Sequence, residues 1–412
     1  MQGTGKALAN EYVTVWQADE PARQIGYCPA LAILPTGRLV GTLLVKDDRP
    51  SAEVEWLVIA YTSDDGGETW APRTRIPMVD GFPFVAGEAV YIIGGRDDLK
   101  IARSDDGGTT WTEALPLETG RQWYSYPGSI VYAHGRVYLV RECRTEPVRH
   151  GYPAWILAPV VLSASLDDDL TRPDAWTYSN VLSFGDVLAR HGQPNLIGTP
   201  FYAPGRHGSE DAHRSMSKMG WGEANLVQIT DPDHIWHDPA GKTFHMFLRA
   251  ATGRSNLACL AKATEQADGN ILVDLEKAPS GEPVLYVPFP GGHIGFTMLK
   301  DPQTGLHWLV SSQATDSMRR VDRLHPKHYG MPFNERRNLA LHFSRNCIDW
   351  CFAALLVEGD EIERSCYGGS CVIDGDDLVI LMRTANANAR NAHDSNLITF
   401  HRVPRFRKLA YA

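Results

Sequence analysis

SDDGGETW at residues 63–70 and SDDGGTTW at residues 104–111 are two copies of one pattern, S-x-D-x-G-x-T-W. The aspartate of the pattern can accept hydrogen bonds from backbone amides, and its glycine can adopt a positive φ. The closing tryptophan offers a large ring that can pack between sheets. The pattern therefore predicts a tight turn between two strands. A degenerate copy lies at 344–350, and another with an insertion is predicted within 165–176.

A second repeat is a hairpin, in which two apolar runs flank a short turn that contains glycine. The six copies span 30–45, 82–95, 129–140, 235–248, 296–310 and 370–382, with turn glycines Gly37, Gly87, Gly135, Gly241, Gly305 and Gly375. Hairpins that recur every 50–70 residues or so are typical of the blades of a β-propeller.

We therefore expect an all-β fold, a single β-propeller domain over residues 1–412. Six four-stranded blades are favoured, and seven are possible. The blades are expected near 25–78, 79–117, 118–183, 220–288, 289–357 and 358–403. Residues 184–219 form either a long loop insertion or a degenerate blade. Residues 11–16 (EYVTVW) are expected to be the strand that closes the ring, so that no sheet edge stays free.

Composition limits the partners. The chain has a net charge of −9, which argues against nucleic acid, and no apolar run reaches the roughly 18 residues of a membrane helix. Residues 1–16 hold no apolar signal region, so we expect a cytoplasmic protein, or a periplasmic or secreted one if a signal has been removed. Seven cysteines without a CxxC pair indicate buried thiols rather than disulfides or zinc. Neither a metal nor a cofactor is expected, and the oligomeric state stays open.

The eight-residue pattern resembles the Asp box of the sialidase (neuraminidase, BNR-repeat) superfamily, which implies a sialidase-like propeller. The resemblance extends in order to four places where that family keeps its chemistry. They are Glu223 in GWGEANLVQI, Arg249 in HMFLRA, Arg337 in NERRNLALHFS and Tyr367 in SCYGGSCVI. The resemblance implies that Tyr367 is the nucleophile, that Glu223 takes its proton, and that the arginines hold the substrate's carboxylate.

Two positions depart from the family pattern. Tyr27 stands where the family has its first arginine, so an acidic sugar is better supported than sialic acid itself. The family's acid/base aspartate precedes the first Asp box. The carboxylates there are Asp47, Asp48, Glu53 and Glu55, and the spacing from Ser63 favours Glu53 or Glu55.

The residues alone also predict an anion site. Four predicted hairpins have an arginine at the end of their second strand: Arg96, Arg141, Arg249 and Arg383. Propeller symmetry brings these ends toward one axis, where clustered cations repel unless an anion such as a carboxylate or sulfate compensates them. The alternative is that each arginine pairs with a nearby acid such as Asp97, Glu142 or Asp394.

Histidines provide a further set of candidates. His293 and His213 are expected to line the pocket, in loops like those of His191, His207 and His393. A histidine or tyrosine base beside arginines is the equipment of a polysaccharide lyase, and some propeller enzymes that act on rhamnose–glucuronate linkages look like this.

The leading hypothesis is an exo-acting glycoside hydrolase that removes a terminal acidic sugar from an oligo- or polysaccharide. Arg249, Arg337 and either Arg383 or Arg141 would hold the anion. One alternative is a lyase or rhamnosidase on uronate-containing glycans. The other is a propeller that binds glycans without catalysis.

Overall fold

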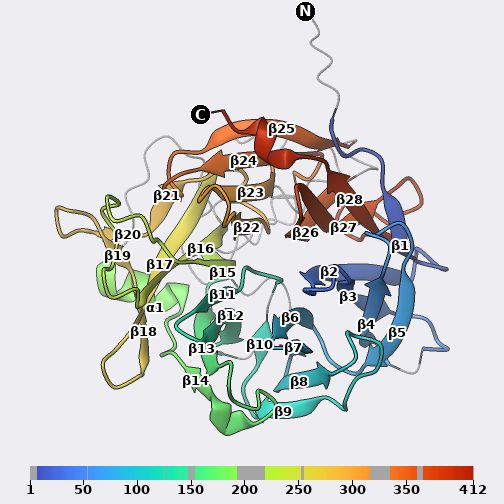
Figure 1. Cartoon of the computed structure of the whole chain (residues 1–412), viewed down its shortest axis with the longest axis horizontal. Helices are drawn as coiled ribbons and strands as arrows, with labels where there is room; N and C mark the ends of the chain where they lie inside the picture. The colour runs from blue at the N-terminus through green and yellow to red at the C-terminus, as the bar shows by residue number, and fades with distance from the viewer. Residues whose placement is uncertain are drawn as a thin grey trace, which may run out of the picture.

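Six β-sheets stand around a central axis like the blades of a propeller (Figure 1). The computed structural model describes residues 7–52, 54–124, 126–146, 154–192, 219–251, 255–315, 335–359 and 365–411. Nearly all of the regular structure in these ranges is strand, and the predicted all-β, six-bladed propeller is confirmed. Every pairing within a blade is antiparallel, as hairpin connections require.

The first three sheets follow the chain in order. Their strands are β2 (Gln24–Ile33), β3 (Leu39–Asp47), β4 (Trp56–Ser63) and β5 (Ala71–Ile76); β6 (Phe82–Ala86), β7 (Ala89–Gly95), β8 (Leu99–Ser104) and β9 (Leu115–Glu118); β10 (Trp123–Tyr124), β11 (Val131–Ala133), β12 (Arg136–Arg144), β13 (Leu157–Ser165) and β14 (Trp176–Tyr178). In the third sheet β10 and β11 share the same edge of β12, so its innermost strand is interrupted.

The other three sheets repeat this plan. Their strands are β15 (Gly220–Val227), β16 (Thr243–Ala251), β17 (Leu257–Glu265), β18 (Ile271–Asp274) and β21 (Tyr286–Pro288); β22 (Thr297–Lys300), β23 (His307–Ser312), β24 (Asn338–Ser344) and β25 (Cys351–Glu358); β26 (Ser365–Asp374), β27 (Asp377–Ala385), β28 (Leu397–Val403) and β1 (Val13–Gln17). A separate two-stranded ribbon joins β19 (Glu276–Lys277) to β20 (Pro283–Val284).

The sixth sheet contains both ends of the fold. Strand β1 pairs with β28 in the order β1-β28-β27-β26, so an N-terminal strand completes the C-terminal blade (Figure 1). A layer of buried apolar side chains packs this blade against the first. It joins Val15 and Phe400 of the sixth blade to Leu31 and Leu43 of the first. Such burial between blades supplies most of the driving force for closing the ring.

The turn glycines behave as the sequence predicts. All six hairpin glycines have a positive φ, from 59° at Gly375 to 85° at Gly37. One predicted hairpin is wrong in its first half, however. Residues 235–242 form turns rather than a strand, with Ile235 73% exposed, and β16 pairs instead with β15. Ile235 is exposed, Trp236 is only partly buried, and most of the other residues here are polar, so the run lacks the alternating apolar pattern of a buried strand.

The two S-x-D-x-G-x-T-W segments form closely similar turns. In the first, Asp65 accepts hydrogen bonds from the Ser63 hydroxyl at 2.8 Å and from the Thr69 amide at 2.9 Å, and Trp70 Nε1 donates to the Gly67 carbonyl. Asp106 plays the same part in the second. A further hydrogen bond from the Thr69 hydroxyl contributes most to lowering the pKa of Asp65 to about 2, and the bonds from the Thr69 amide and Ser63 add to this effect.

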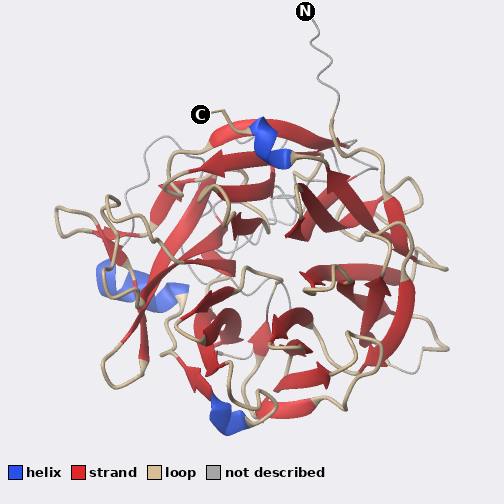
Figure 2. Ribbon diagram, in the orientation of Figure 1, coloured by secondary structure: helices blue, strands red, loops and turns tan. Residues whose placement is uncertain are grey.

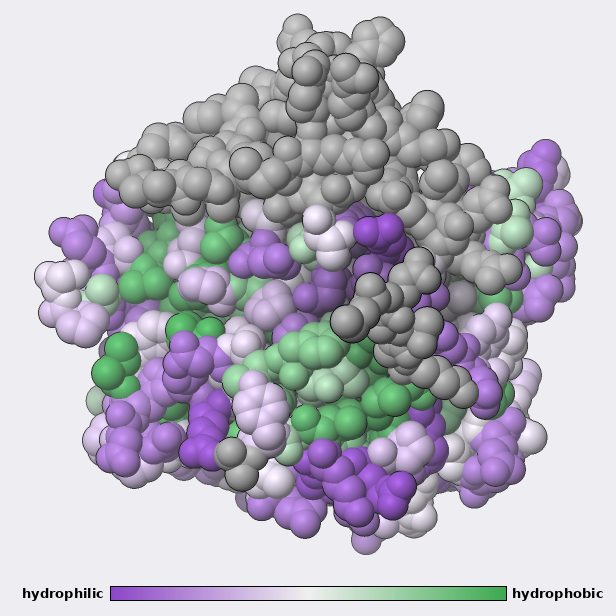
Figure 3. Space-filling model, turned by 90° about the horizontal axis from the view of Figure 1, so that it is seen from above, coloured by the Kyte–Doolittle hydropathy of each residue, from purple (hydrophilic) through white to green (hydrophobic). Residues whose placement is uncertain are grey.

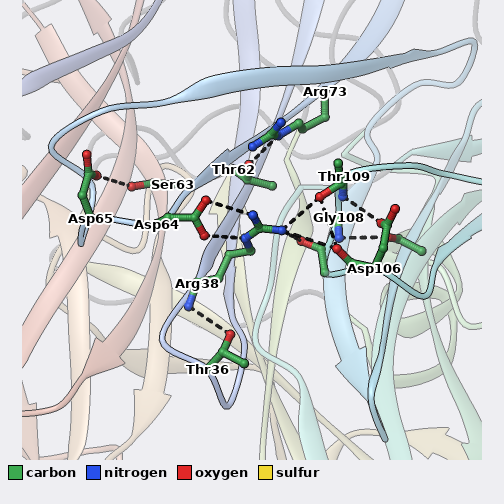
Figure 4. A network of polar contacts seen from close by, with 12 residues as sticks. Thr36, Arg38, Thr62, Ser63, Asp64, Asp65, Arg73, Asp106, Gly108 and Thr109 are labelled. Atoms are coloured by element: carbon green, nitrogen blue, oxygen red, sulfur yellow. Dashed lines mark hydrogen bonds and ion pairs between the residues drawn. The ribbon is translucent and has the colours of Figure 1, made fainter.

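Arg38 ties the two turns together across the first two blades (Figure 4). Its Nε and Nη2 bind both carboxylate oxygens of Asp64, at 2.6 and 2.9 Å. Its Nη1 donates to the Thr109 hydroxyl at 3.0 Å. The planar guanidinium is suited to this forked contact, so the turns join blades as well as strands.

Helical segments lie at the rim of the propeller (Figure 2). They are η1 (Pro173–Ala175), α1 (Phe184–His191) and η4 (Phe406–Leu409). Helix α1 begins at a capping box in which Ser183 and Asp186 bind each other's backbone amides. It occupies the start of the segment expected as a loop insertion or degenerate blade; residues 193–218 of that segment lie outside the described residues.

Seen edge-on, the coloured surface carries an apolar area surrounded by polar residues (Figure 3). Among the described residues, none of the helices has the length and apolar character needed to cross a membrane.

Candidate active site

Three of the innermost strands break their register at the same step. The pairing of β2 with β3 shifts between Tyr27 and Ala30, that of β15 with β16 between Gly222 and Asn225, and that of β26 with β27 between Tyr367 and Ser370. The residue that follows the last regular pair has a left-handed backbone in each case: φ is 43° at Cys28, 57° at Glu223 and 52° at Gly368. Such bulges are common beside active sites because they redirect side chains.

The second blade has a left-handed residue just ahead of its first strand. Asp80 has a φ of 52° and precedes β6 by two positions. Burial, Asp80 and Glu223 all raise the pKa of the Cys28 thiol, and Arg383 lowers it. These side chains come from four different blades, so the bulges bring them to a common centre at the axis.

Two buried arginines contact the ring of Tyr367. The Cζ atoms of Arg336 and Arg383 lie 3.6 and 4.6 Å from its centroid, and both arginines are at most 6% exposed. Arg383 also lies 4.3 Å from the ring of Tyr27. Within the described ranges neither guanidinium forms an ion pair with a carboxylate, and the Nε of each makes no hydrogen bond. Burial, which is the largest cause, lowers the pKa of Arg336 to about 9.

The Tyr367 hydroxyl and Arg383 bind the same backbone carbonyl. It donates to the His393 carbonyl at 2.7 Å, and Arg383 Nη2 donates to that carbonyl at the same distance. No hydrogen bond joins Tyr367 to Glu223 in the described structure. The predicted nucleophile and its predicted proton acceptor are thus hydrogen-bonded to other groups in the described structure.

Glu223 forms a buried ion pair with Arg249. Glu223 Oε1 accepts from Arg249 Nη1 at 2.9 Å, and Arg249 Nε donates to the His293 carbonyl at 3.0 Å. The other carboxylate oxygen of Glu223 is buried and has no hydrogen-bond partner in the described part of the chain. Of the predicted anion ligands, Arg249 is therefore already neutralised, whereas its Glu223 partner keeps one oxygen for another contact.

A second carboxylate lies beside Glu223. Glu142 Oε1 accepts from the Ala224 amide at 2.8 Å, next to Glu223 in the chain. Burial, with a smaller contribution from Glu223, raises the pKa of Glu142 to about 8. Its neighbour Arg141 is fully buried and donates to the Asp80 carbonyl at 2.8 Å. Glu142 and Glu223 therefore lie close together in different environments. Enzymes use such differences to give one carboxyl group the role of acid and another the role of base.

Tyr126 lies between these groups, and no sequence pattern pointed to it. Its hydroxyl is buried without a hydrogen-bond partner among the described residues. A Cβ placed on Gly368 would come within 2.3 Å of that hydroxyl, and one on Gly295 within 3.1 Å of the ring. The Gly295 Cβ would also lie 2.9 Å from Glu223 Oε2. Two glycines from the fifth and sixth blades therefore make room for a tyrosine from the third.

Tyr27, which stands where the sialidase pattern has an arginine, contacts a histidine–aspartate pair. Its hydroxyl donates to Asp394 Oδ1 at 3.4 Å, and the same oxygen lies 2.9 Å from His393 Nδ1. The His393 and Tyr27 rings are 6.0 Å apart, in an edge-on arrangement. Arg336 and Arg383 both lower the pKa of His393, after the larger effect of burial.

The remaining predicted residues are placed elsewhere or are not described. Arg96 stacks on Trp56, with its Cζ atom 4.6 Å from the ring. Arg337 is half-buried and donates to the Thr315 hydroxyl, while its neighbour Arg336 faces Tyr367. Glu55 is exposed, 3.7 Å from Lys46. Glu53 and His213 lie outside the described residues.

Past the bulges, the axis opens into an apolar channel. Its cavity of about 970 Å³ is lined by the stretches that follow the bulges, among them 30–35, 82–87, 127–132 and 370–373. Tyr126 and Pro127 therefore stand at the boundary between the polar cluster and this channel. Among the described residues, no group of three or more His, Cys, Asp or Glu side chains is arranged to hold a metal ion.

Known structures share this propeller. No family model and no curated protein sequence matches the chain. The Hadza microbial sialidase Hz136 is 14% identical, with a TM-score of 0.53, over 95% of this chain and 68% of that one. The Penicillium chrysogenum α-L-arabinanase in complex with arabinobiose is 12% identical, with a TM-score of 0.52, over 98% and 99%. A leech intramolecular trans-sialidase is 12% identical, with a TM-score of 0.52, over 95% and 70%. At these identities the likeness shows a sialidase-like fold.

Proposed function

We propose that the protein is an exo-acting glycoside hydrolase that removes a terminal sugar carrying an acidic group. The observation that carries this proposal is the pair Arg336 and Arg383 at the axis. Two buried guanidiniums without a carboxylate partner in the described structure repel each other and have given up hydration. An anion bound between them, with forked hydrogen bonds to their free Nε atoms, would offset both costs.

The fold of the neighbours supports a carbohydrate as the ligand. The solved structures that resemble this chain include sialidases, which act on sialic acid, and an arabinanase bound to arabinobiose. An axial site for one terminal residue fits an exo-acting enzyme, because Tyr126 stands at the inner end of the polar cluster. The acidic group distinguishes the proposed substrate from a neutral arabinoside.

The chemistry assigned to the site is hydrolysis at the anomeric carbon. Glu223 would act as the base through Oε2, since Oε1 is held by Arg249. Once its hydroxyl has left the His393 carbonyl, Tyr367 would attack the anomeric carbon while its proton passes to Glu223. A phenol activated in this way is a neutral nucleophile that the substrate's own anion does not repel.

Aryl glycosides test this proposal directly. The full chain should release the aryl group from at least one of the sialic, glucuronic or galacturonic acid glycosides, and not from an arabinofuranoside. Arg383→Gln should raise KM for that substrate by about 100-fold, the loss expected for a charged hydrogen bond of roughly 3 kcal/mol. The exposed Arg172→Gln is the matched control. Turnover of the neutral glycoside alone would overturn the proposal.

A second candidate is β-elimination on a uronate-containing glycan. His393 beside Arg336 and Arg383 favours it, because arginines that neutralise a uronate carboxylate acidify the adjacent C–H, and a neutral imidazole can accept that proton. Elimination leaves an unsaturated sugar that absorbs in the near ultraviolet, whereas hydrolysis does not. Following absorbance while the enzyme digests a uronate polysaccharide separates the two.

A further inference from the structure

The loop between β27 and β28 carries a histidine–aspartate pair that the proposed hydrolysis has not yet used. Asp394 Oδ1 lies 2.9 Å from His393 Nδ1 and accepts a second hydrogen bond from the Tyr27 hydroxyl. Asn391 Nδ2 donates to the other carboxylate oxygen at 3.0 Å, and Arg390 lies 3.8 Å from it. With these partners Asp394 stays ionised, and its pKa is lowered to about 2.

This environment fixes the tautomer of the imidazole. An ionised carboxylate at Nδ1 places a proton there, as the orienting acid does in catalytic histidine–aspartate pairs. The Nε2 atom makes no hydrogen bond in the described part of the chain, and the side chain is 29% exposed. The Nε2 atom of His393 is thus available for a substrate, and Asp394 holds the ring in place through Nδ1.

The backbone of the same residue fixes its place in the site. The His393 carbonyl accepts from both Tyr367 and Arg383, so the imidazole is anchored beside the anion-binding arginines. Of the two acids that the sequence favoured for protonating the leaving group, Glu53 lies outside the described residues and Glu55 is exposed beside Lys46. The buried Glu142 is held by the Ala224 amide.

We propose that His393, oriented by Asp394, is the group that protonates the leaving oxygen, and that it takes up this proton when the acidic substrate binds. The inference rests on the proposed function. The bond between the anomeric carbon and the leaving oxygen breaks, its electron pair stays on that oxygen, and the Nε2 proton neutralises it. The neutral imidazole then accepts a proton from the water whose hydroxyl adds to the anomeric carbon. The bond from that carbon to the Tyr367 oxygen breaks at the same time, and Glu223 returns its proton to that oxygen.

Electrostatics couple the proton to the substrate. In the free protein the groups that face His393 are Arg336 and Arg383, which disfavour the imidazolium, and Asp394, which favours it; burial also disfavours it. An anion between the arginines cancels their effect, so the pKa of His393 rises on binding. Between the two pKa values, one proton is therefore taken up with each anion, and the acid forms only in the loaded site.

Nuclear magnetic resonance of ¹⁵N-histidine in the full chain tests this coupling without substrate. His393→Gln assigns the signal, which should report a proton on Nδ1. Arg383→Gln should raise the pKa of His393 by about 1 unit, whereas Arg172→Gln should leave it unchanged. An unshifted His393 in Arg383→Gln would contradict the inference and leave the proposed anion site intact.

The second arm adds N-acetylneuraminate or glucuronate, with glucose as the neutral control. A bound sugar acid should raise the pKa of His393; binding without such a rise refutes the inference alone. If calorimetry detects neither acid binding, the proposed function itself fails.

Leaving-group dependence then separates a catalytic role from a structural one. His393→Gln should slow cleavage of an alkyl glycoside by about 100-fold or more, because general acid catalysis contributes 10²–10⁴-fold. Cleavage of a nitrophenyl glycoside, whose leaving group needs no proton, should fall less than tenfold. Equal losses for both substrates would show that His393 only holds the loop.

Discussion

The Arg336 guanidinium stacks on the Tyr367 ring with only 3.6 Å between its Cζ atom and the ring centroid. An aromatic face attracts a cation, but it does not cancel the charge as a carboxylate does. The site therefore holds uncompensated positive charge at its centre, with Arg383 close by on the same ring. Stability and anion affinity should consequently respond in opposite directions when Arg336 is removed.

Arg336→Gln should stabilise the free protein and weaken its binding of sugar acids. The pKa of Arg336 is lowered in the folded state, so its charged form costs stability at every pH below about 9. We expect the melting temperature to rise by about 2–4 °C, the shift that roughly 1 kcal/mol produces in larger domains. Calorimetric scans with and without glucuronate measure both effects. A lower melting temperature would mean that the cation stabilises the fold.

Glu223→Gln should destabilise the protein by about 3 kcal/mol. It removes one partner of the buried salt bridge between Glu223 and Arg249, a change that typically costs about 3–5 kcal/mol. The double variant Glu223→Gln with Arg249→Met should recover part of that loss, because it replaces both members of the pair. Urea unfolding of the four proteins gives the coupling. Additive losses would indicate that the ion pair contributes nothing to the fold.

Gly368→Ala should cost more stability than the same change at Gly375. Both glycines have a left-handed φ, 52° and 59°, so alanine strains the backbone equally. Only at Gly368 would the new Cβ collide with Tyr126, because Gly375 has nothing within 4 Å. We expect about 1 kcal/mol at Gly375 and about 3 kcal/mol at Gly368 from denaturant unfolding. Tyr126→Ala should narrow the difference, and equal costs would argue against a tight fit.

Stability should fall as the pH rises through the titration of Glu142. Its folded pKa of about 8 lies above that of an unfolded glutamate, so the native state holds the extra proton between about pH 4.5 and 8. The stabilisation is full below this window and is lost as the pH rises through it. Glu142→Gln, which cannot ionise, should flatten the curve of unfolding midpoint against pH. An identical slope in the variant would assign it to another group.

The sequence predicted the propeller because its signals are local. A turn glycine such as Gly37 and the aspartate at 65 each determine a few residues around them, and six repeats of the unit leave little choice of architecture. Helix α1 could have been found from Ser183 and Asp186, which form a recognisable capping box. The run of turns at 235–242 was misassigned because the apolar residues in a sequence do not by themselves reveal which of them reach the core.

The site was harder to predict because it depends on bulges. Two unpaired residues at Cys28 or Glu223 shift the register, and no pattern in the sequence announces a shift. Arg336 and Arg337 are adjacent and lie just before β24, yet it is Arg336 that stacks on the Tyr367 ring, so choosing between them needs the three-dimensional course of the chain. Tyr126 lies between the two short pieces of an interrupted strand, and it fits there because glycines of other blades leave room for its ring and hydroxyl.

Pairing of β1 with β28 has a consequence for how the chain reaches its fold. Strand β1 must wait for a partner that lies nearly 400 residues later in the chain, so the sixth blade cannot assemble until β28 has been synthesised. During that wait the first and fifth blades each expose a face that the sixth will cover. The same seam is where a force applied to the two termini would act first, peeling β1 from β28 before any other blade opens.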